Sequence, residues 1–206
     1  MKLIQMEVGH LGTNCYIIYC EQTLKAAVID PGGSAEAIMA EINKANLNVE
    51  YIINTHGHAD HIASNDAIKQ ATGAKVLIHH DDAGMLTSAE RNLSVYIGGG
   101  FVSSPADRLL SHNDTITIGN IELKVLHTPG HTPGGICLLS ETLVIAGDTL
   151  FAESIGRTDF PGGSYSQLIK SIKENLLVLS DNVKVLPGHG PETTIGWERK
   201  HNSFVQ

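Results

Sequence analysis

One heptapeptide is the most informative stretch of this chain: Thr55-His56-Gly57-His58-Ala59-Asp60-His61. It directly follows the short apolar run 51–54, which predicts a β-strand. Two residues apart just after a strand, His56 and His58 can point the same way, whereas Asp60 and His61 lie on the turn into the next helix. The heptapeptide therefore predicts two adjacent metal sites at the carboxyl end of a strand, where α/β sheets usually place their chemistry.

One heptapeptide cannot saturate two metals, so other strand ends must supply further ligands. Three candidates fit: His131 in a T-P-G-H-T segment, Asp148 in G-D-T and His189 in P-G-H-G. Each follows an apolar strand-like run and a glycine, which permits close backbone approach and an unusual φ. Imidazole and carboxylate are ordinary zinc ligands. The other six of the 11 histidines lack this context and are expected at the surface or in support of the ligands: His10, His79, His80, His112, His127 and His201.

Strand and helix signals alternate along the rest of the chain. Three β-rich runs (2–8, 14–20 and 25–30) precede a helix that Ser34 is expected to cap and that ends near Asn46. Helices are expected at 62–72 and 168–177, and hairpins at 115–126 and 136–146. Two such halves would pack sheet to sheet with helices outside. The irregular stretch 87–113, which contains Gly98-Gly99-Gly100, is expected to wall a pocket.

Length and composition exclude several classes of protein. The 206 residues suit one domain, 1–206. A formal net charge of −8 argues against a nucleic-acid groove or an anionic membrane surface. We find no apolar run long enough to cross a bilayer and no signal peptide. Cys15, Cys20 and Cys137 form an odd set without a C-x-x-C pair, which predicts reduced thiols and a cytoplasmic protein.

The H-x-H-x-D-H run, with the later His131, Asp148 and His189 segments, resembles the metallo-β-lactamase superfamily, specifically its short glyoxalase II-like (hydroxyacylglutathione hydrolase-like) members. The similarity runs from Asn14-Cys15-Tyr16 to the His189 region. It implies an α+β fold, a four-layer αββα sandwich of two mixed sheets with helices on both outer faces. It also implies one metal held by His56, His58 and His131, a second held by Asp60, His61 and His189, and Asp148 bridging them.

Such a centre predicts a metal-dependent hydrolase that acts on a small-molecule substrate. Two divalent ions, Zn²⁺ foremost with iron or manganese as alternatives, would generate a hydroxide near neutral pH and polarise a carbonyl. Asp60 is expected to orient that hydroxide or accept its proton, a role that competes with ligation. A thioester suits the site, because a thiolate leaves without a strong general acid. The ligand count leaves the centre slightly cationic, which would favour an anionic substrate.

Arg157, in Gly156-Arg157-Thr158-Asp159-Phe160, could bind a substrate carboxylate bidentately, or could instead pair with Asp159. Glyoxalase II places a basic residue and a tyrosine in the similar segment, and Asp159 stands near the tyrosine's place. That family also has a C-terminal helical domain that completes its glutathione site. Because this chain ends 17 residues after His189, we expect no such domain.

Other activities remain as alternatives. The sequence is also similar to persulfide dioxygenases, which use one iron held by residues matching His56, His131 and Asp148. A metal-storing module would instead need a saturated coordination sphere. A nuclease is disfavoured by the charge of −8, and β-lactam hydrolysis by the cytoplasmic prediction.

Overall fold

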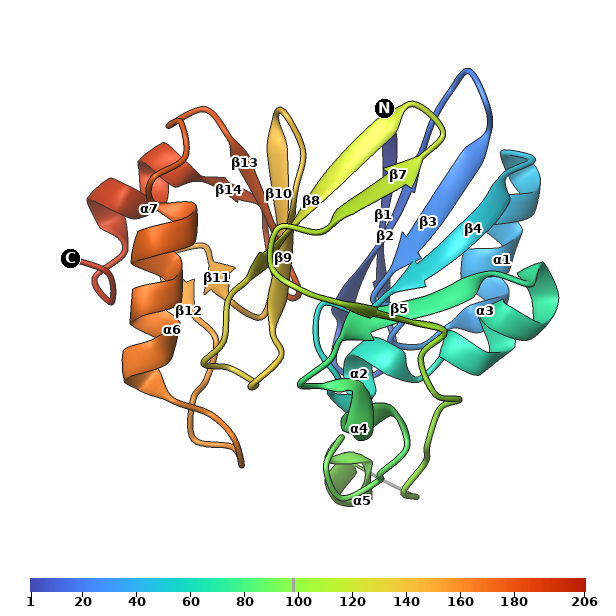
Figure 1. Ribbon diagram of the computed structural model, residues 1–206, viewed down its shortest axis with the longest axis horizontal. Helices are drawn as coiled ribbons and strands as arrows, with labels where there is room; N and C mark the ends of the chain where they lie inside the picture. Colours follow the sequence, from blue (N-terminus) through green and yellow to red (C-terminus); the bar gives the residue numbers. More distant parts are fainter. Residues whose placement is uncertain (98) are drawn as a thin grey trace.

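The computed structural model describes residues 1–97 and 99–206, which form two six-stranded sheets packed face to face (Figure 1). The first sheet has the order β1 (Lys2–Val8), β2 (Thr13–Tyr19), β3 (Lys25–Ile29), β4 (Asn48–Ile53), β5 (Lys75–His79), β6 (Arg108–Leu110). The second has the order β14 (Thr193–Thr194), β13 (Lys184–Pro187), β10 (Leu143–Gly147), β9 (Ile136–Leu139), β8 (Ile121–His127), β7 (Thr115–Ile118). A separate hairpin joins β11 (Leu150–Phe151) to β12 (Ser154–Ile155).

Both sheets are mixed, as predicted. The first is antiparallel from β1 to β3 and parallel from β3 to β6. In the second, β10 and β13 pair in parallel and the other strands pair antiparallel. Parallel pairing brings the carboxyl ends of neighbouring strands to one edge of a sheet, so the loops after them gather there.

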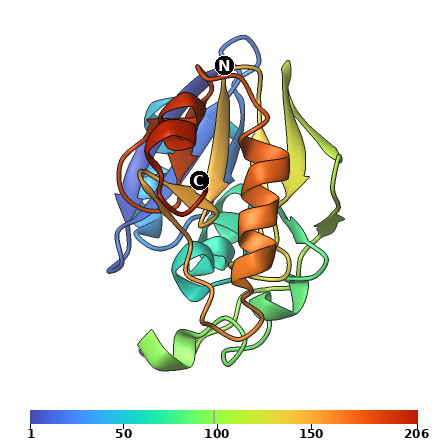
Figure 2. The ribbon, with the colours of Figure 1, turned by 90° about the vertical axis from the view of Figure 1, so that its left-hand side faces the viewer.

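Helices cover the outer face of each sheet (Figure 1). α1 (Ala35–Lys44) and α3 (Asn65–Thr72) pack on the first sheet. α6 (Tyr165–Ser171), the π-helix Ile172–Leu176 that continues it, and α7 (Ile195–His201) pack on the second, and Figure 2 shows them in front of its strands. The expected α+β, four-layer arrangement is confirmed.

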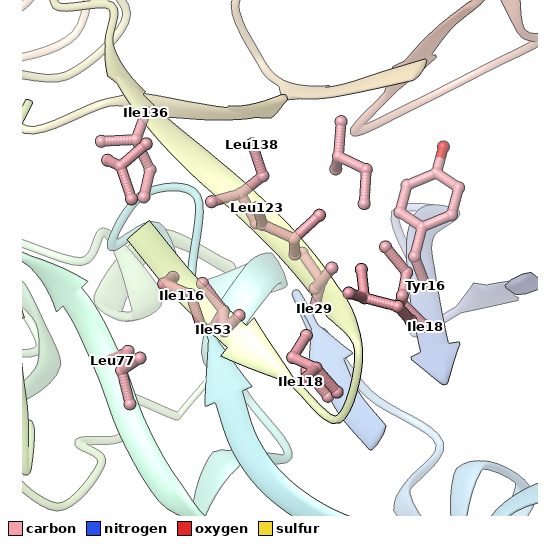
Figure 3. Packing of buried hydrophobic residues seen from close by; sticks show 14 of the residues in the cluster. Tyr16, Ile18, Ile29, Ile53, Leu77, Ile116, Ile118, Leu123, Ile136 and Leu138 are labelled. Carbon is pink, nitrogen blue, oxygen red and sulfur yellow. The ribbon is translucent and has the colours of Figure 1, made fainter. Parts of the chain in front are cut away.

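The core follows the period-2 alternation of buried strands. On β2, Tyr16 and Ile18 face the second sheet, whereas Cys15 and Ile17 face the helices. β2 therefore reads as a continuous apolar run, because both of its faces are covered. Figure 3 shows the layer between the sheets, where side chains such as Leu123 of β8 interdigitate with those of the first sheet.

Three local expectations need correction. The helix expected at 62–72 is two pieces, α2 (Ala59–Ile62) and α3, because the Ser64 amide donates to the Pro31 carbonyl (2.8 Å) and turns the chain. Ser34 does not cap α1: it has a left-handed φ of 55°, and its Oγ accepts from the Gly9 amide (3.3 Å). The helix expected at 168–177 begins earlier, at Tyr165, and its second half is π-helical.

The stretch 87–113 follows α4 (Ala83–Leu86) and contains α5 (Ser94–Ile97) and β6. Asn92 Nδ2 and the Ser94 hydroxyl both donate to the Phe101 carbonyl (3.0 Å each), which closes the stretch into a loop. It walls the cleft described below, as predicted, although Gly98 lies outside the described residues. In the described part of the chain, the three cysteines are free and buried, and no helix combines the length and apolar character needed to span a bilayer.

Candidate metal centre

The loop after β4 delivers four ligand-type side chains. His56, His58 and His61 are buried, and Asp60 is partly exposed. His58 is extended and precedes α2, whereas Asp60 and His61 lie on that helix. The offset expected from the heptapeptide is present.

The second sheet delivers the other three. His131 follows β8, Asp148 follows β10 and His189 follows β13. Hydrogen bonds join the β13 loop to β2 of the first sheet. The Asn14 backbone amide donates to the Gly188 carbonyl (2.7 Å), and the Tyr16 hydroxyl donates to the Pro187 carbonyl (2.7 Å). The two sheets therefore hold their ligand loops in a fixed relation.

The seven side chains converge in overlapping clusters, two of which match the groups implied by the resemblance, while a third joins His56, His61 and Asp148. Ligand-type atoms of His56, His58 and His131 lie within 4.8 Å of one another, and so do those of Asp60, His61 and His189. In the first group, His58 Nδ1 is 2.9 Å from His131 Nε2. In the second, Asp60 Oδ2 is 3.2 Å from His189 Nε2 and 3.7 Å from His61 Nε2.

Asp148 lies between the groups. Its Oδ2 is 3.5 Å from His131 Nε2 and 3.8 Å from His189 Nε2, and its Oδ1 is 3.5 Å from His61 Nε2. Among the described residues, the buried atoms without a hydrogen-bond partner are His56 Nε2, His61 Nδ1, His61 Nε2 and Asp148 Oδ1, of which His61 Nδ1 lies beside the Asp30 carboxylate. Orphaned buried polar atoms are costly and rare, and divalent cations in the two groups would satisfy the other three. The donor set fits two metal ions, although the individual ligand assignments stay predictions.

Electrostatics separate the two groups. Burial, followed by the neighbouring His131, lowers the pKa of His58 to about 3. Burial also lowers the pKa of His61, but the carboxylates of Asp148 and Asp60 outweigh it and raise that pKa to about 10. His58 thus has a free lone pair at neutral pH, whereas a metal ion at the second group would replace a proton on His61.

Asp30, which sequence reasoning missed, supports the heptapeptide from the end of the neighbouring strand β3. It is buried, its Oδ1 accepts from the Thr55 amide (2.7 Å), and its Oδ2 accepts from the Thr55 hydroxyl (2.6 Å). The same Oδ2 lies 3.0 Å from His61 Nδ1, which directs Nε2 towards the centre. Its position directly after the apolar run 25–29 was the available signal.

Asp82, also missed, ties the two ligand loops together. Its buried carboxylate accepts from the Thr132 hydroxyl (2.7 Å) and from the amides of Gly134 (2.7 Å) and Gly57 (3.2 Å). Burial raises the pKa of Asp82 despite these three donors. One carboxylate thus fixes the segments on both sides of the first group.

Close packing explains all three ligand-preceding glycines. A Cβ on Gly188 would collide with Asp148 Oδ1, one on Gly130 with the Leu168 backbone and one on Gly147 with the Thr55 side chain. Gly188 has no left-handed φ, whereas Gly130 (φ 136°) and Gly147 (φ 48°) do. The expected close approach is therefore confirmed at all three positions, but the unusual φ occurs only before His131 and Asp148.

The centre forms the floor of an open cleft of about 820 Å³, which Arg157 also lines. The Arg157 carbonyl accepts from His131 Nδ1 (2.7 Å), so its backbone orients a ligand. Its guanidinium pairs with Asp159 through two hydrogen bonds (2.8 and 2.7 Å). The pairing alternative is therefore the one present, and substrate binding by Arg157 stays a prediction.

Some of the remaining histidines also cluster. His79 is buried, and its ring stacks on His127 (centroids 4.0 Å apart, 13° between planes) and packs against His80 (4.1 Å). Ligand-type atoms of His79, His80 and Asp81 lie within 4.8 Å of one another. The Asp81 amide, however, already donates to His79 Nδ1 (3.3 Å). The expectation of an ordinary surface or supporting role missed this stack, because its partners are far apart in sequence.

Comparison with known proteins agrees with this geometry. A family model described as the metallo-beta-lactamase superfamily matches residues 8–189. Hydroxyacylglutathione hydrolase GloC of Haemophilus influenzae is 35% identical over 93% of this chain and 92% of that protein. A crystal structure of BLEG-1 B3 metallo-β-lactamase is 36% identical, with a TM-score of 0.95 and complete coverage of both chains.

A crystal structure of TTHA1623 in a di-iron-bound form is 30% identical, with a TM-score of 0.87, and the match covers 98% of this chain and 99% of that one. Iron in a similar fold means that the fold alone does not select zinc. The family-model match spans most of the chain and confirms the resemblance drawn from the sequence. The chain therefore belongs to the metallo-β-lactamase superfamily.

Proposed function

We propose that the protein is a dinuclear metal hydrolase that cleaves a small thioester. The observation that supports this proposal best is the convergence of seven ligand-type side chains in two groups around Asp148, on the floor of an open cleft. The open cleft argues against a metal-storing module, which would enclose its ions. The similarity to GloC, at 35% identity, supports a thioester as the bond that is cleaved.

His56, His58 and His131 would hold one metal ion, and Asp60, His61 and His189 the other, with Asp148 shared. When bound, a pair of divalent ions supplies an activated water at neutral pH and polarises a carbonyl. The chain's own residues position these elements. The Arg157 carbonyl orients His131, Asp30 orients His61, and Asp82 fixes the loops that carry the first group.

Asp60 combines ligation with a second role. Its carboxylate lines the cleft, and Oδ2 lies at the limit of hydrogen bonding from the Thr13 hydroxyl (3.5 Å). We propose that it accepts a hydrogen bond from the attacking water. In the reaction, water adds to the acyl carbon and the carbon–sulfur bond breaks, which yields a carboxylic acid and a thiol. A thiol with a pKa near 8.5 leaves readily as the thiolate.

Metal analysis and thiol release test this proposal together. Protein purified without added metal should contain close to two ions per chain, and elemental analysis identifies them. Metal-loaded protein should release thiol from model thioesters, and chelation should abolish the release. A fully loaded protein that is inert towards a broad thioester panel would contradict the proposal.

A persulfide dioxygenase-like activity remains the alternative from sequence. It needs only His56, His131 and Asp148, and the presence of the second group around the buried His61 argues for the hydrolase instead. One iron per chain, with oxygen uptake on glutathione persulfide, would favour the dioxygenase.

Hydrolysis of a β-lactam amide is a further candidate because of the 36% identity to the BLEG-1 B3 enzyme. An amide leaving group needs a proton that a thiolate does not need, so β-lactam hydrolysis also requires a proton donor placed at the departing nitrogen. Assaying a β-lactam beside the thioesters discriminates the two activities.

A further inference from the structure

Above its polar floor, the cleft has an apolar wall. The wall comes from four separate segments: the β1–β2 turn, the end of α5 with the turn before it, the β11–β12 hairpin and the loop that follows. Its side chains are Leu11, Leu93, Tyr96, Phe151, Ile155 and Phe160. Leu11 is 54% exposed and Tyr96 is 80% exposed. Large apolar side chains gathered in the open around a site typically mark a binding surface.

The wall adjoins both ligand groups. Phe160 packs edge-on against His58 of the first group, with ring centroids 5.7 Å apart. Phe151 packs against His189 of the second group, at 6.4 Å. A substrate whose reacting carbonyl lies over Asp148 would therefore meet an aromatic ring on either side, one for the acyl half and one for the thiol half.

The wall carries no free positive charge. Among the described residues that line the cleft, Arg157 is the only lysine or arginine. Its Nε and Nη2 donate to the two carboxylate oxygens of Asp159, and its guanidinium carbon lies 3.7 Å from the centre of the Phe160 ring. The ion pair is more than half exposed and adds little stability. Its effect is to offset the positive charge of the arginine beside the aromatic wall.

We propose that the substrate is a thioester in which both the acyl group and the thiol are uncharged and apolar, rather than a glutathione conjugate or the anionic substrate that the ligand count alone favoured. This inference rests on the proposed thioester hydrolysis and specifies its substrate class. Glutathione carries two carboxylates, and outside the metal centre the cleft offers neither of them an unpaired cation. Uncharged groups instead gain contact with the wall on both sides of the centre.

A two-by-two set of substrates tests the inference. 4-Methylpentanoyl and succinyl groups have nearly the same shape but differ in charge, and each is attached to N-acetylcysteamine or to glutathione. For the metal-loaded protein, kcat/KM should be highest for the doubly neutral thioester, by about tenfold over either singly charged one. Equal or higher values for the glutathione or succinyl thioesters overturn the inference but leave thioester hydrolysis intact. If none of the four is hydrolysed, the proposed function fails as well.

Two variants locate the effect in the wall. Leu11→Ala should lower kcat/KM for the doubly neutral thioester several-fold. Leu109→Ala is its matched control, because Leu109 is also 54% exposed but lies on β6, outside the cleft lining. Equal kinetics for the two leucine variants would overturn the assignment of the wall.

Asp159→Asn releases Arg157 from its ion pair. The freed guanidinium should bind carboxylates, so kcat/KM should rise several-fold for the glutathione thioesters. A loss or no change with glutathione thioesters would contradict the neutralising role of Asp159. Circular dichroism spectra of all three variants check that each is folded.

Discussion

Two clusters of histidine in this molecule look alike in composition and differ in geometry. At the centre, ligand atoms from both sheets converge, and His56 Nε2, His61 Nε2 and Asp148 Oδ1 lack protein partners among the described residues. In the stack of His79, His80 and His127, the rings of His79 and His127 lie nearly parallel, and His79 Nδ1 already accepts a hydrogen bond from the Asp81 backbone amide. Convergence of unpartnered lone pairs, rather than the number of imidazoles, distinguishes a metal centre from a packed surface cluster.

Substitution of Asp148, the ligand shared by the two groups, should cause the largest loss of metal content and activity. Asp148→Ala removes the carboxylate that reaches both groups, so the protein should bind about one metal ion or none. Activity should fall by about a thousandfold or more, because metal-ion catalysis supplies several kcal/mol. Elemental analysis and thioester turnover measure the two effects. Full metal content with full activity would remove Asp148 from the centre.

Asp82 should give the next effect. Asp82→Ala leaves the Thr132 hydroxyl and the Gly57 and Gly134 amides without their acceptor, which loosens both loops of the first group. Substitution of a residue that supports the ligands in this way typically lowers metal affinity or activity by about 10–100-fold. Competition with a chromophoric chelator measures the affinity. Asp81→Ala is the neighbouring control, because the Asp81 carboxylate contacts neither ligand loop among the described residues. The metal affinity of this variant should match that of the wild-type protein.

The histidine stack should affect stability instead. Burial, then His127 and His80, lowers the pKa of His79 to about 4. The folded protein therefore binds fewer protons than the unfolded chain below about pH 6.5, and stability is lost as the pH falls from about 6.5 to 4. His79→Gln should flatten this dependence by an amount on the order of 1 kcal/mol.

Denaturant unfolding at several pH values measures that slope, with the exposed His10→Gln as the control. The other charged and titratable groups near the stack are His80, His112, His127, Asp81 and Asp114, and they remain in both variants. Identical slopes for the two variants would show that His79 does not titrate with folding.

His112 should give the smallest effect. It is exposed, and its Nδ1 accepts from the His127 amide (3.1 Å) at the rim of the stack. His112→Ala should retain two metal ions and change turnover by less than about twofold, as expected for a surface substitution. A loss of activity equal to that of Asp148→Ala would overturn the distinction between the two clusters.

Local pattern predicted much of the fold and of the site. Apolar runs such as 25–29 and 51–53 are strands because alternate side chains fill two buried layers. This does not depend on the conformation of the connecting loops. The seven ligand-type residues come after four such runs, β4, β8, β10 and β13, so their spacing in the sequence was enough to place them at strand ends. The break between α2 and α3 was missed, because it depends on Pro31, which is more than 30 residues away.

The sequence by itself determined most of the strands, the approximate places of the main helices and the kinds of ligand, because these depend on side-chain periodicity and on neighbours in the chain. Only the tertiary structure decided which side chains support the ligands, as Asp30 and Asp82 do, and which of the two roles left open for Arg157 is present, its pairing with Asp159. Asp30 meets the heptapeptide only when β3 and β4 pair, and Asp82 meets Thr132 and Gly134 only when the two sheets pack against each other. Their partners are selected by the shape of the packed core, and no local pattern records that shape.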